Sequence, residues 1–500
     1  MVYSWWLSYP LAIGADDSVF YHVSIFYWVS LPLLLGSMFL MAVMTKNNLL
    51  KWLLAIGIVL TLYSLYYFYS TIPTSDTQYF RGLSEYFIQT KNLDVSQSNH
   101  SYYQWPSYFL LIYTVISITG LSLTNFEFLL FTLIGILWAT CLYVYVSKKY
   151  KDGAFIAVVA FFIAMLSFLN YQAVPFSLAI GIFFVLLMME TLPKSRPIII
   201  TELILYGSLL ITHVFVPLLF VIYLLIRSIL DKSARGLYGR LFLFSLVSYF
   251  AVQLSLARFS FAQILTSILR APTEYISMVS ATLAPVTVPF DVTAQLFSRT
   301  VQVAFVLICV VGFVFLLIKR KLSVLDKAIL LMGASYSILG VFINSLGWRA
   351  VSIAFIPISL GAAFLFEKSR FKLYFKGVFL ILLVLFVFIP VHQAFGNTAA
   401  YQTEADYQTE NFFINHYNSE NPQSILMGFR AETYVSAKLP VSTDISTNVE
   451  TLNSSDIIIL TSELLGKNSL GENITSASLL QEEQLNVIYN NGYSIIAVRP

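Results

Sequence analysis

Residues 126–147, FEFLLFTLIGILWATCLYVYVS, form a run of apolar side chains that contains a single charged residue, Glu127. A helix rises about 1.5 Å per residue, so roughly twenty apolar residues are enough to cross the ~30 Å hydrocarbon core of a bilayer. Lys148, Lys149 and Lys151 follow directly. The stretch therefore predicts a transmembrane helix that ends in a basic loop.

The whole chain has the composition of a membrane protein. Its 500 residues are 58% hydrophobic, 16% aromatic and only 11% charged, whereas roughly a quarter of the residues of a soluble protein are charged. The mean hydropathy is +0.77. A net charge of +3 is too small to indicate a nucleic-acid partner. Cys141 and Cys309 lie within apolar runs, which favours small core residues over a disulfide or a metal–thiolate site.

Apolar runs like the first recur along the chain and predict a polytopic α-helical fold with about twelve transmembrane helices. The predicted spans are 24–44, 50–70, 126–147, 153–170, 173–190, 197–212, 213–230, 241–257, 300–318, 328–345, 349–366 and 377–396. A long loop, 71–125, separates the second span from the third, and another, 258–299, precedes the ninth.

Alternate connections between these spans are basic. Six short loops hold 19 of the 29 lysines and arginines: Lys46 and Lys51; Lys148, Lys149 and Lys151; Lys194 and Arg196; Arg227, Lys232, Arg235 and Arg240; Lys319, Arg320, Lys321 and Lys327; Lys368, Arg370, Lys372 and Lys376. Because positive charge is retained on the cytoplasmic side, these loops are predicted to face inward. The plasma membrane is the expected location.

Two patterns agree with this orientation, since both fall on the opposite, extracytoplasmic side. The first is the set of Asn-x-Ser/Thr sequons, at Asn99, Asn453 and Asn473. The second is the set of all five histidines: His22, His100, His213, His392 and His416. Loops 71–125 and 258–299 are then also outside.

The first outer loop predicts two further helices. In TQYFRGLSEYFIQTK (77–91), Phe80, Leu83 and Phe87 recur at helical spacing and form an apolar stripe suited to the membrane interface. The segment 101–122 is apolar and aromatic, opens with Trp105-Pro106 and closes near Gly120. It is interpreted as an interfacial or re-entrant helix, because a full span here would invert every later loop.

The last hundred residues change character, which divides the chain into a membrane module, 1–398, and a second unit, 399–500. In this unit charge returns and short apolar runs alternate with helix-like segments. LNVIYNNGYSIIAV (485–498) is typical of a β-hairpin with Asn-Asn-Gly at its turn. The unit is predicted to be a small extracytoplasmic α/β domain.

Asp76 stands where the chain leaves the second span, in STIPTSDTQYFRG (70–82), and has two interpretations. Ser75 or Asp76 is suited to capping the helix that follows, because a side-chain oxygen there accepts hydrogen bonds from unpaired backbone N–H groups. Alternatively, Asp76 is a catalytic base at the boundary between water and lipid. A helix cap alone would not require the long aromatic segment that follows.

These segments resemble the GT-C glycosyltransferases, particularly their prokaryotic and archaeal members. The likeness lies in DTQYFRGLSEYFIQTKNLD (76–94), in YYQWPSYFLLIYTVISITGLS (102–122), in LLITHVFVPLLF (209–220) and in GWRAVSIAFIPISL (347–360). The motifs are short, although the likeness in architecture covers the whole chain. The resemblance implies transfer of a sugar from a polyprenyl- or dolichyl-phosphate donor to a glycan, lipid or protein acceptor.

The resemblance also implies roles for particular residues. Asp76 would be the general base that activates the acceptor hydroxyl in an inverting single displacement. Arg349 would hold the phosphate leaving group, which needs a cation rather than a strong acid. From their own positions in the sequence, Arg81 and His213 are candidates for further donor-phosphate contacts, and Glu274 and Asp291, in the second outer loop, are candidates for binding a metal or the acceptor.

Structural alternatives accompany each of these roles. Arg349 could reach lipid head groups, Arg81 could pair with Asp76 or be a solvated helix residue, and His213 could be a satisfied turn residue. Glu85 and Asp94 are expected on the wet face of the loop, and Glu127 is suited to the helix dipole at the start of its span. Loop 258–299 covers the helix bundle or orders over a bound substrate.

The chain also departs from the family pattern. Many relatives carry histidine four residues after the aspartate, where this chain has Phe80, and no second acid stands beside Asp76. Both absences weaken the case for a metal at this loop, which leaves metal-independent catalysis or a weakly held Mg²⁺ or Mn²⁺ ion. Three other functions stay open: a secondary transporter, a polymerase or ligase of lipid-linked glycans, and a non-catalytic envelope protein. Spans with few ionisable residues argue against the transporter.

Overall fold

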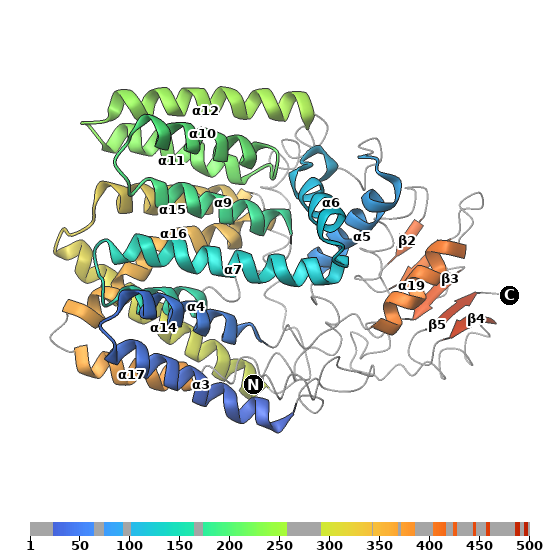
Figure 1. Cartoon of the computed structure of the whole chain (residues 1–500), viewed down its shortest axis with the longest axis horizontal. Coiled ribbons are helices and arrows are strands. Elements are labelled where there is room, and N and C mark those ends of the chain that lie inside the picture. The colour runs from blue at the N-terminus through green and yellow to red at the C-terminus, as the bar shows by residue number, and fades with distance from the viewer. Residues whose placement is uncertain are drawn as a thin grey trace.

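The chain is seen here in a computed structural model. The structure describes residues 24–64, 75–93, 102–164, 174–257, 292–342, 344–368, 372–385, 404–416, 424–427, 444–446, 457–460, 486–490 and 495–498. These residues form fifteen helices and five short strands. Most of the helices make up one large bundle, and the strands gather in a single sheet beyond one end of it, beside the last helix (Figure 1).

A helix lies over each of the twelve segments predicted to cross the membrane. These helices are α3 (Ile25–Met44), α4 (Asn48–Leu62), α7 (Leu123–Ser147), α8 (Ala154–Ala164), α9 (Pro175–Met189), α10 (Arg196–Leu210), α11 (Val216–Leu230), α12 (Arg235–Leu256), α14 (Val292–Ile318), α15 (Val324–Phe342), α16 (Asn344–Lys368) and α17 (Lys372–Leu385). The others are α5 (Ser75–Thr90), α6 (Ser107–Thr119) and α19 (Glu404–His416).

Several of these helices have the dimensions of a membrane span. By length and composition, α3, α7, α12 and the Thr300–Ile318 part of α14 can each cross a bilayer. Shorter apolar helices, among them α4, α8, α9 and α11, accompany them. A mostly helical chain with this many apolar helices fits the predicted class of helical membrane protein.

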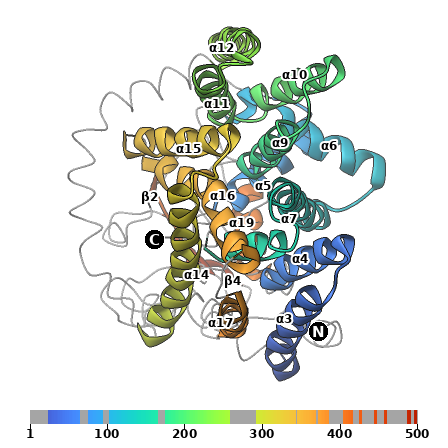
Figure 2. The same cartoon turned by 90° about the vertical axis from the view of Figure 1, so that its left-hand side faces the viewer.

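The helices of the bundle run alongside one another (Figure 1). Seen end-on, α16 lies near the middle, whereas α12, α3 and α17 lie at the edges (Figure 2). Large aliphatic side chains are exposed on the edge helices, for example Leu33 on α3 and Val247 on α12. Such faces suit a bundle surrounded by lipid rather than by water.

Local chemistry sets the ends of these helices. Asn47 caps α4, its side-chain oxygen accepting from the N–H groups of Leu49 at 2.9 Å and Leu50 at 3.3 Å. Helices α9, α10 and α11 each carry proline in the first turn, where its missing N–H costs nothing. Gly120 ends α6 at φ +70°, a left-handed conformation that glycine adopts without strain.

Glycines let the backbone of α16 approach its neighbours closely. A Cβ atom added to Gly361 would lie 2.0 Å from the carbonyl oxygen of Cys309 on α14. One added to Gly333 on α15 would lie 2.5 Å from the backbone of Ala354. Because these contacts are backbone to backbone, no flexible side chain can yield, and α16 is held tightly on two sides.

We expect Gly361→Ala to destabilise the bundle by about 1–3 kcal/mol or more, the usual cost of overpacking a tight core. The added methyl group would force α14 and α16 apart. Gly207→Ala on α10 is the matched control, since nothing lies within 4 Å of its added Cβ. Thermal unfolding in detergent measures both variants. If Gly361→Ala unfolded at the same temperature as Gly207→Ala, α14 and α16 would not pack through these glycines.

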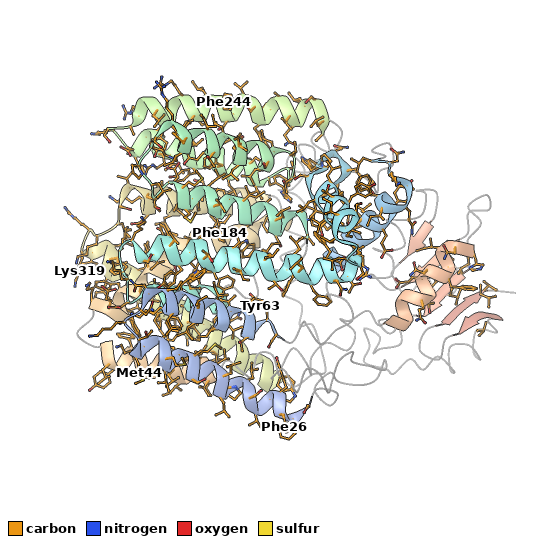
Figure 3. All side chains as sticks on the ribbon, viewed as in Figure 1. Phe26, Met44, Tyr63, Phe184, Phe244 and Lys319 are labelled. Carbon is orange, nitrogen blue, oxygen red and sulfur yellow. The ribbon has the colours of Figure 1, made fainter. Side chains whose placement is uncertain are left out.

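The basic loops gather at the end of the bundle that carries Met44 and Lys319, on the left of Figure 3. Six acids lie in or near these loops, and each forms an ion pair with a lysine or arginine. The pairs are Asp152 with Lys51, Glu190 and Glu202 with Lys194, Asp231 with Arg227, Asp326 with Lys149, and Glu367 with Lys368. The remaining cations give this end a large excess of positive charge.

One of these pairs joins the first turn of α4 to a loop through a buried lysine. Lys51, almost fully buried, contacts Asp152 in the loop between α7 and α8. The backbone N–H of Asp152 in turn donates to Glu367 at the end of α16, at 3.2 Å. The hydrogen bond from Lys51 is the main cause that lowers the pKa of Asp152 from its ordinary 3.8. The ionised form of Asp152 therefore stabilises the fold.

This shift predicts an acid-dependent loss of stability. A lowered pKa contributes stability that is present above pH 3.8 and is lost as the pH falls through the folded value. Asp152→Asn lacks the titrating group, so its stability deficit relative to the natural chain should be constant near neutral pH and should shrink below about pH 4. Unfolding temperatures from about pH 7 to about pH 3 test this. A deficit that stays constant across that range would contradict the assignment.

A buried polar network ties α9 to α12 at the same end. Glu190 accepts hydrogen bonds from the hydroxyl groups of Tyr223 and Tyr238, both at 2.9 Å, and from Lys194 at 2.6 Å. Arg227 donates to the hydroxyl of Tyr238 at 2.7 Å and lies over its ring. The sequence shows the charges of this network but not that tyrosines join them.

The five strands form one mixed sheet in the order β2-β1-β3-β5-β4. They are β1 (Ser424–Met427), β2 (Asp444–Ser446), β3 (Ile457–Leu460), β4 (Asn486–Asn490) and β5 (Ile495–Val498). Strands β2, β1 and β3 are parallel, and β5 is antiparallel to both β3 and β4. The pairing of β4 with β5 confirms the predicted hairpin strands, and α19 contacts β5.

Candidate functional site

The segment that carries Asp76 folds as predicted into a helix, α5, whose first residue is Ser75. Asp76 therefore lies in the first turn of α5, and the structure describes its backbone only. The predicted apolar stripe is buried: Phe80, Leu83 and Phe87 have little or no exposed surface. The expectation that this stripe lies along the lipid interface is thus corrected, because its side chains pack inside the protein.

The stripe packs on the aromatic side chains of α6 and of the turn before it. The ring of Phe80 lies edge-on to Tyr102, with the centroids 4.7 Å apart, and 6.0 Å from Tyr108. Phe87 is 5.5 Å from Tyr113 in the same manner. Edge-to-face aromatic pairs contribute about 0.5–1.5 kcal/mol each beyond the area that they bury. The two outer helices thus form one aromatic unit at the end of the bundle opposite the basic loops (Figure 1).

Hydrogen bonds dock this aromatic unit on the membrane helices. The N–H of Ser107, the first residue of α6, donates to the carbonyl of Ile211 at 3.1 Å. The indole N–H of Trp105 donates to Gln253 on α12 at 3.3 Å. Within the unit, the hydroxyl of Tyr103 donates to the carbonyl of Leu83 at 2.6 Å. The first outer loop is therefore attached to the α10–α11 turn and to the end of α12.

Arg81 attaches α5 to the start of α7. Its Nε donates to Glu85 at 3.2 Å, Nη1 to Glu127 at 3.3 Å, and Nη2 to the hydroxyl of Thr124 at 2.9 Å. The Arg81 side chain is 12% exposed and that of Glu127 only 2%. The alternative that Arg81 is a solvated helix residue is therefore wrong. Its contacts with Glu127 and Thr124 hold α5 against the start of α7, whereas the pair with Glu85 lies within α5 itself.

Two carboxylates share this one guanidinium. Glu85 is partly buried at 22% exposure, so the expectation that it lies on the wet face of the loop holds only in part. The sequence suggests that the carboxylate of Glu127 interacts with the dipole of its own helix. In the structure it forms an ion pair with Arg81 on α5, which lies 46 residues earlier in the chain. The presence of a carboxylate within an apolar run was the only sequence signal for such a partner.

His213 lies in the turn between α10 and α11, as the Thr-His motif predicts. Its Nδ1 accepts a hydrogen bond from the N–H of Phe215 at 3.2 Å, and its ring packs against Phe176 with centroids 5.3 Å apart. The imidazole is almost fully buried. These contacts match the interpretation of a satisfied turn residue. A contact of His213 with donor phosphate stays a prediction.

Arg349 is the sixth residue of α16, the helix at the middle of the bundle, and Pro357 lies farther along the same helix. The structure describes the backbone of Arg349 and not its side chain. Glu274, Asp291 and Asp94 lie outside the described residues. Among the residues that the structure describes, no group of three or more His, Cys, Asp or Glu side chains is arranged to hold a metal ion.

A scan against protein-family models found no match to the chain, and neither did a search of curated proteins. What the protein does must therefore be inferred from its own residues and their geometry. The described part of this candidate site consists of the aromatic unit, the Arg81–Glu127 attachment and the His213 turn. Asp76 lies in the first turn of α5, the helix that Arg81 attaches to α7.

Proposed function

We propose that the chain is a membrane glycosyltransferase of the GT-C type with about twelve transmembrane helices. It would transfer a sugar, with inversion, from a polyprenyl- or dolichyl-phosphate donor to a glycan, lipid or protein acceptor. The reaction would take place on the extracytoplasmic face of the plasma membrane. Asp76 would be the general base, and Arg349 would bind the phosphate of the donor.

The basic loops lie at one end of the bundle and the aromatic unit at the other, and this separation supports the proposed orientation. Basic loops and their ion pairs occupy one end, and the aromatic unit and the sheet lie toward the other (Figure 1). Because cationic loops are retained in the cytoplasm, the end with α5 and α6 would be extracytoplasmic. The sheet with α19 would then be the predicted extracytoplasmic α/β domain.

The observation that carries the proposal is the attachment of α5. Asp76 lies five residues before Arg81, which binds Glu127 and Thr124 at the start of α7. A catalytic group must be held within about 0.5 Å of its productive geometry, and helices hold such groups more accurately than loops. A carboxylate that served only as a helix cap would not need its helix attached by a buried ion pair.

The helix that carries Arg349 is also well fixed. Helix α16 packs backbone to backbone on α14 through Gly312 and Gly361, and on α15 through Gly333. A phosphate leaving group develops charge in the transition state, and a cation already in position stabilises that charge at little reorganisation cost. A rigid central helix is suited to presenting such a cation.

The transporter remains the main alternative from another class. Transporters place ionisable residues near the midplane of the bilayer, where helices are broken. Most of the buried charges described here lie near helix ends instead: Glu127 near the start of α7, Asp326 in the first turn of α15, and Arg227 in the last turn of α11. Glu202, near the middle of α10, is an exception, and it pairs with Lys194 in the loop before that helix. Their positions favour the enzyme.

Incubating the purified chain with a panel of labelled prenyl-phosphate sugars, together with membrane lipids and glycans as acceptors, tests the proposal. At least one donor should lose its label to an acceptor and release prenyl phosphate. The orientation is measured separately, by the accessibility of cysteines introduced into the basic loops and into β4. A correctly oriented protein that transferred sugar from no donor in the panel would refute the transferase and leave the fold intact.

A further inference from the structure

The start of α12 and the turn before it carry three cations that have no acidic partner among the described residues. Lys232, Arg235 and Arg240 are all exposed. The Nε of Arg235 donates to the carbonyl of Ser228 at 3.3 Å, and that of Arg240 to the carbonyl of Gly236 at 3.1 Å. These bonds to the backbone hold the guanidinium groups in place but leave their charge uncompensated. We call Lys232, Arg235 and Arg240 the basic corner.

The acids nearest to the basic corner are occupied elsewhere. Asp231 contacts Arg227 at 3.1 Å, and its other oxygen accepts from the hydroxyl of Ser233 at 2.7 Å. Glu190 is bound by Lys194 and two tyrosines, as described above. In this loop, as in the other cationic loops, one cation holds an acid, here Arg227 with Asp231. The basic corner contributes none of its three charges to an ion pair of the described structure.

An exposed apolar face follows the basic corner along α12. Leu243, Phe244 and Val247 are 59%, 54% and 66% exposed, and they stand three, four and seven residues after Arg240, on one face of the helix. Helix α12 lies at the edge of the bundle, where Phe244 is seen in Figure 3 (see also Figure 2). Nothing lies within 4 Å of a Cβ added at Gly236 or Gly239, so the surface here is open.

A phospholipid has a charged head group and apolar acyl chains. The basic corner suits the head group, and the exposed apolar face that follows it along α12 suits the acyl chains. The geometry points to a binding site for an anionic phospholipid, with its phosphate at the basic corner and its acyl chains along Leu243, Phe244 and Val247. The site rests on the membrane crossing proposed above and not on the transferase activity. It lies at the end of the bundle opposite Asp76.

Charge complementarity determines how much more tightly the site should bind an anionic lipid than a zwitterionic one. An interfacial lysine or arginine strengthens binding to an anionic lipid surface about 5-fold, so three together give about 100-fold over a zwitterionic lipid. Because the cations are exposed, the gain must fall as salt is raised. A zwitterionic lipid occupies the same apolar face without this electrostatic gain.

The full chain in neutral detergent is titrated with phosphatidylglycerol or phosphatidylcholine, and bound lipid is counted by native mass spectrometry. The variant Lys232→Gln/Arg235→Gln/Arg240→Gln removes the basic corner. Its matched control, Arg320→Gln/Lys321→Gln/Lys327→Gln, removes three exposed cations from another loop at the same end. All six residues are exposed, so both variants should fold, and their unfolding temperatures in lipid-free detergent establish this.

The natural chain and the control should both retain phosphatidylglycerol in preference to phosphatidylcholine, and the basic-corner variant should lose about 100-fold of that preference. An equal loss in both variants would overturn the site, because it would mean that only the total charge matters. So would an unchanged preference in the basic-corner variant. If inorganic phosphate at equal concentration displaced the lipid fully, the acyl chains would contribute nothing and the lipid assignment would also be wrong. Sugar transfer is measured separately, so failure here does not touch the proposed activity.

Discussion

Replacing Asp76 with asparagine is expected to reduce sugar transfer by about 10²–10⁴-fold, the usual contribution of a general base. Asparagine matches aspartate in size and caps a helix about equally well, so α5 should form and the protein should insert normally. Only the ability to take the proton of the acceptor hydroxyl is lost. The rate of transfer from a prenyl-phosphate sugar, compared at equal amounts of folded protein, measures the effect.

Two further variants separate catalysis from helix capping. Asp76→Ala removes the base and also the interaction of its carboxylate with the N-terminus of α5, so it should lose transfer to the same extent and also cost about 0.3–1 kcal/mol of stability. Asp94→Asn makes the same chemical change in the same outer loop and should transfer sugar normally. Normal transfer by Asp76→Asn would leave a structural role in the first turn of α5 as the only interpretation that survives.

Replacing Arg81 with alanine is expected to destabilise the protein by about 1–3 kcal/mol, because it leaves the buried carboxyl of Glu127 without its hydrogen-bond partner. Glu127, at 2% exposure, would lose its only ion pair of the described structure, and Thr124 would lose the N–H that it accepts. The attachment between α5 and α7 would open as well. Unfolding temperature and the yield of folded protein in detergent measure the loss.

The double variant Arg81→Leu/Glu127→Leu tells whether the loss comes from the stranded carboxylate. Replacing a buried ion pair by apolar side chains is often close to neutral, so this variant should recover most of the stability. Its transfer rate then tests the predicted contact between Arg81 and donor phosphate. A folded double variant with a normal KM for the donor would limit Arg81 to attaching α5. If Arg81→Ala had the same unfolding temperature as the natural chain, the ion pair between Arg81 and Glu127 would be contradicted.

The sequence by itself determined the class of fold and the division of charge. Hydropathy is a local property, so each apolar run places its own helix, and all twelve predicted segments carry one. The ends of a helix could also be predicted where proline or glycine restricts or permits the backbone conformation, as at Pro106 and Gly120 on either side of α6. The hairpin strands β4 and β5 followed from a short alternating pattern.

Contacts between distant residues were decided only by the tertiary structure. Arg81 and Glu127 are 46 residues apart, and a sequence can show that each needs a partner without showing which one it meets. The same holds for the tyrosines around Glu190 and for the glycines that bring α14 and α16 together. Whether the stripe of α5 faced lipid or protein also depended on where α6 packed, because both surroundings are apolar and the same periodicity suits either.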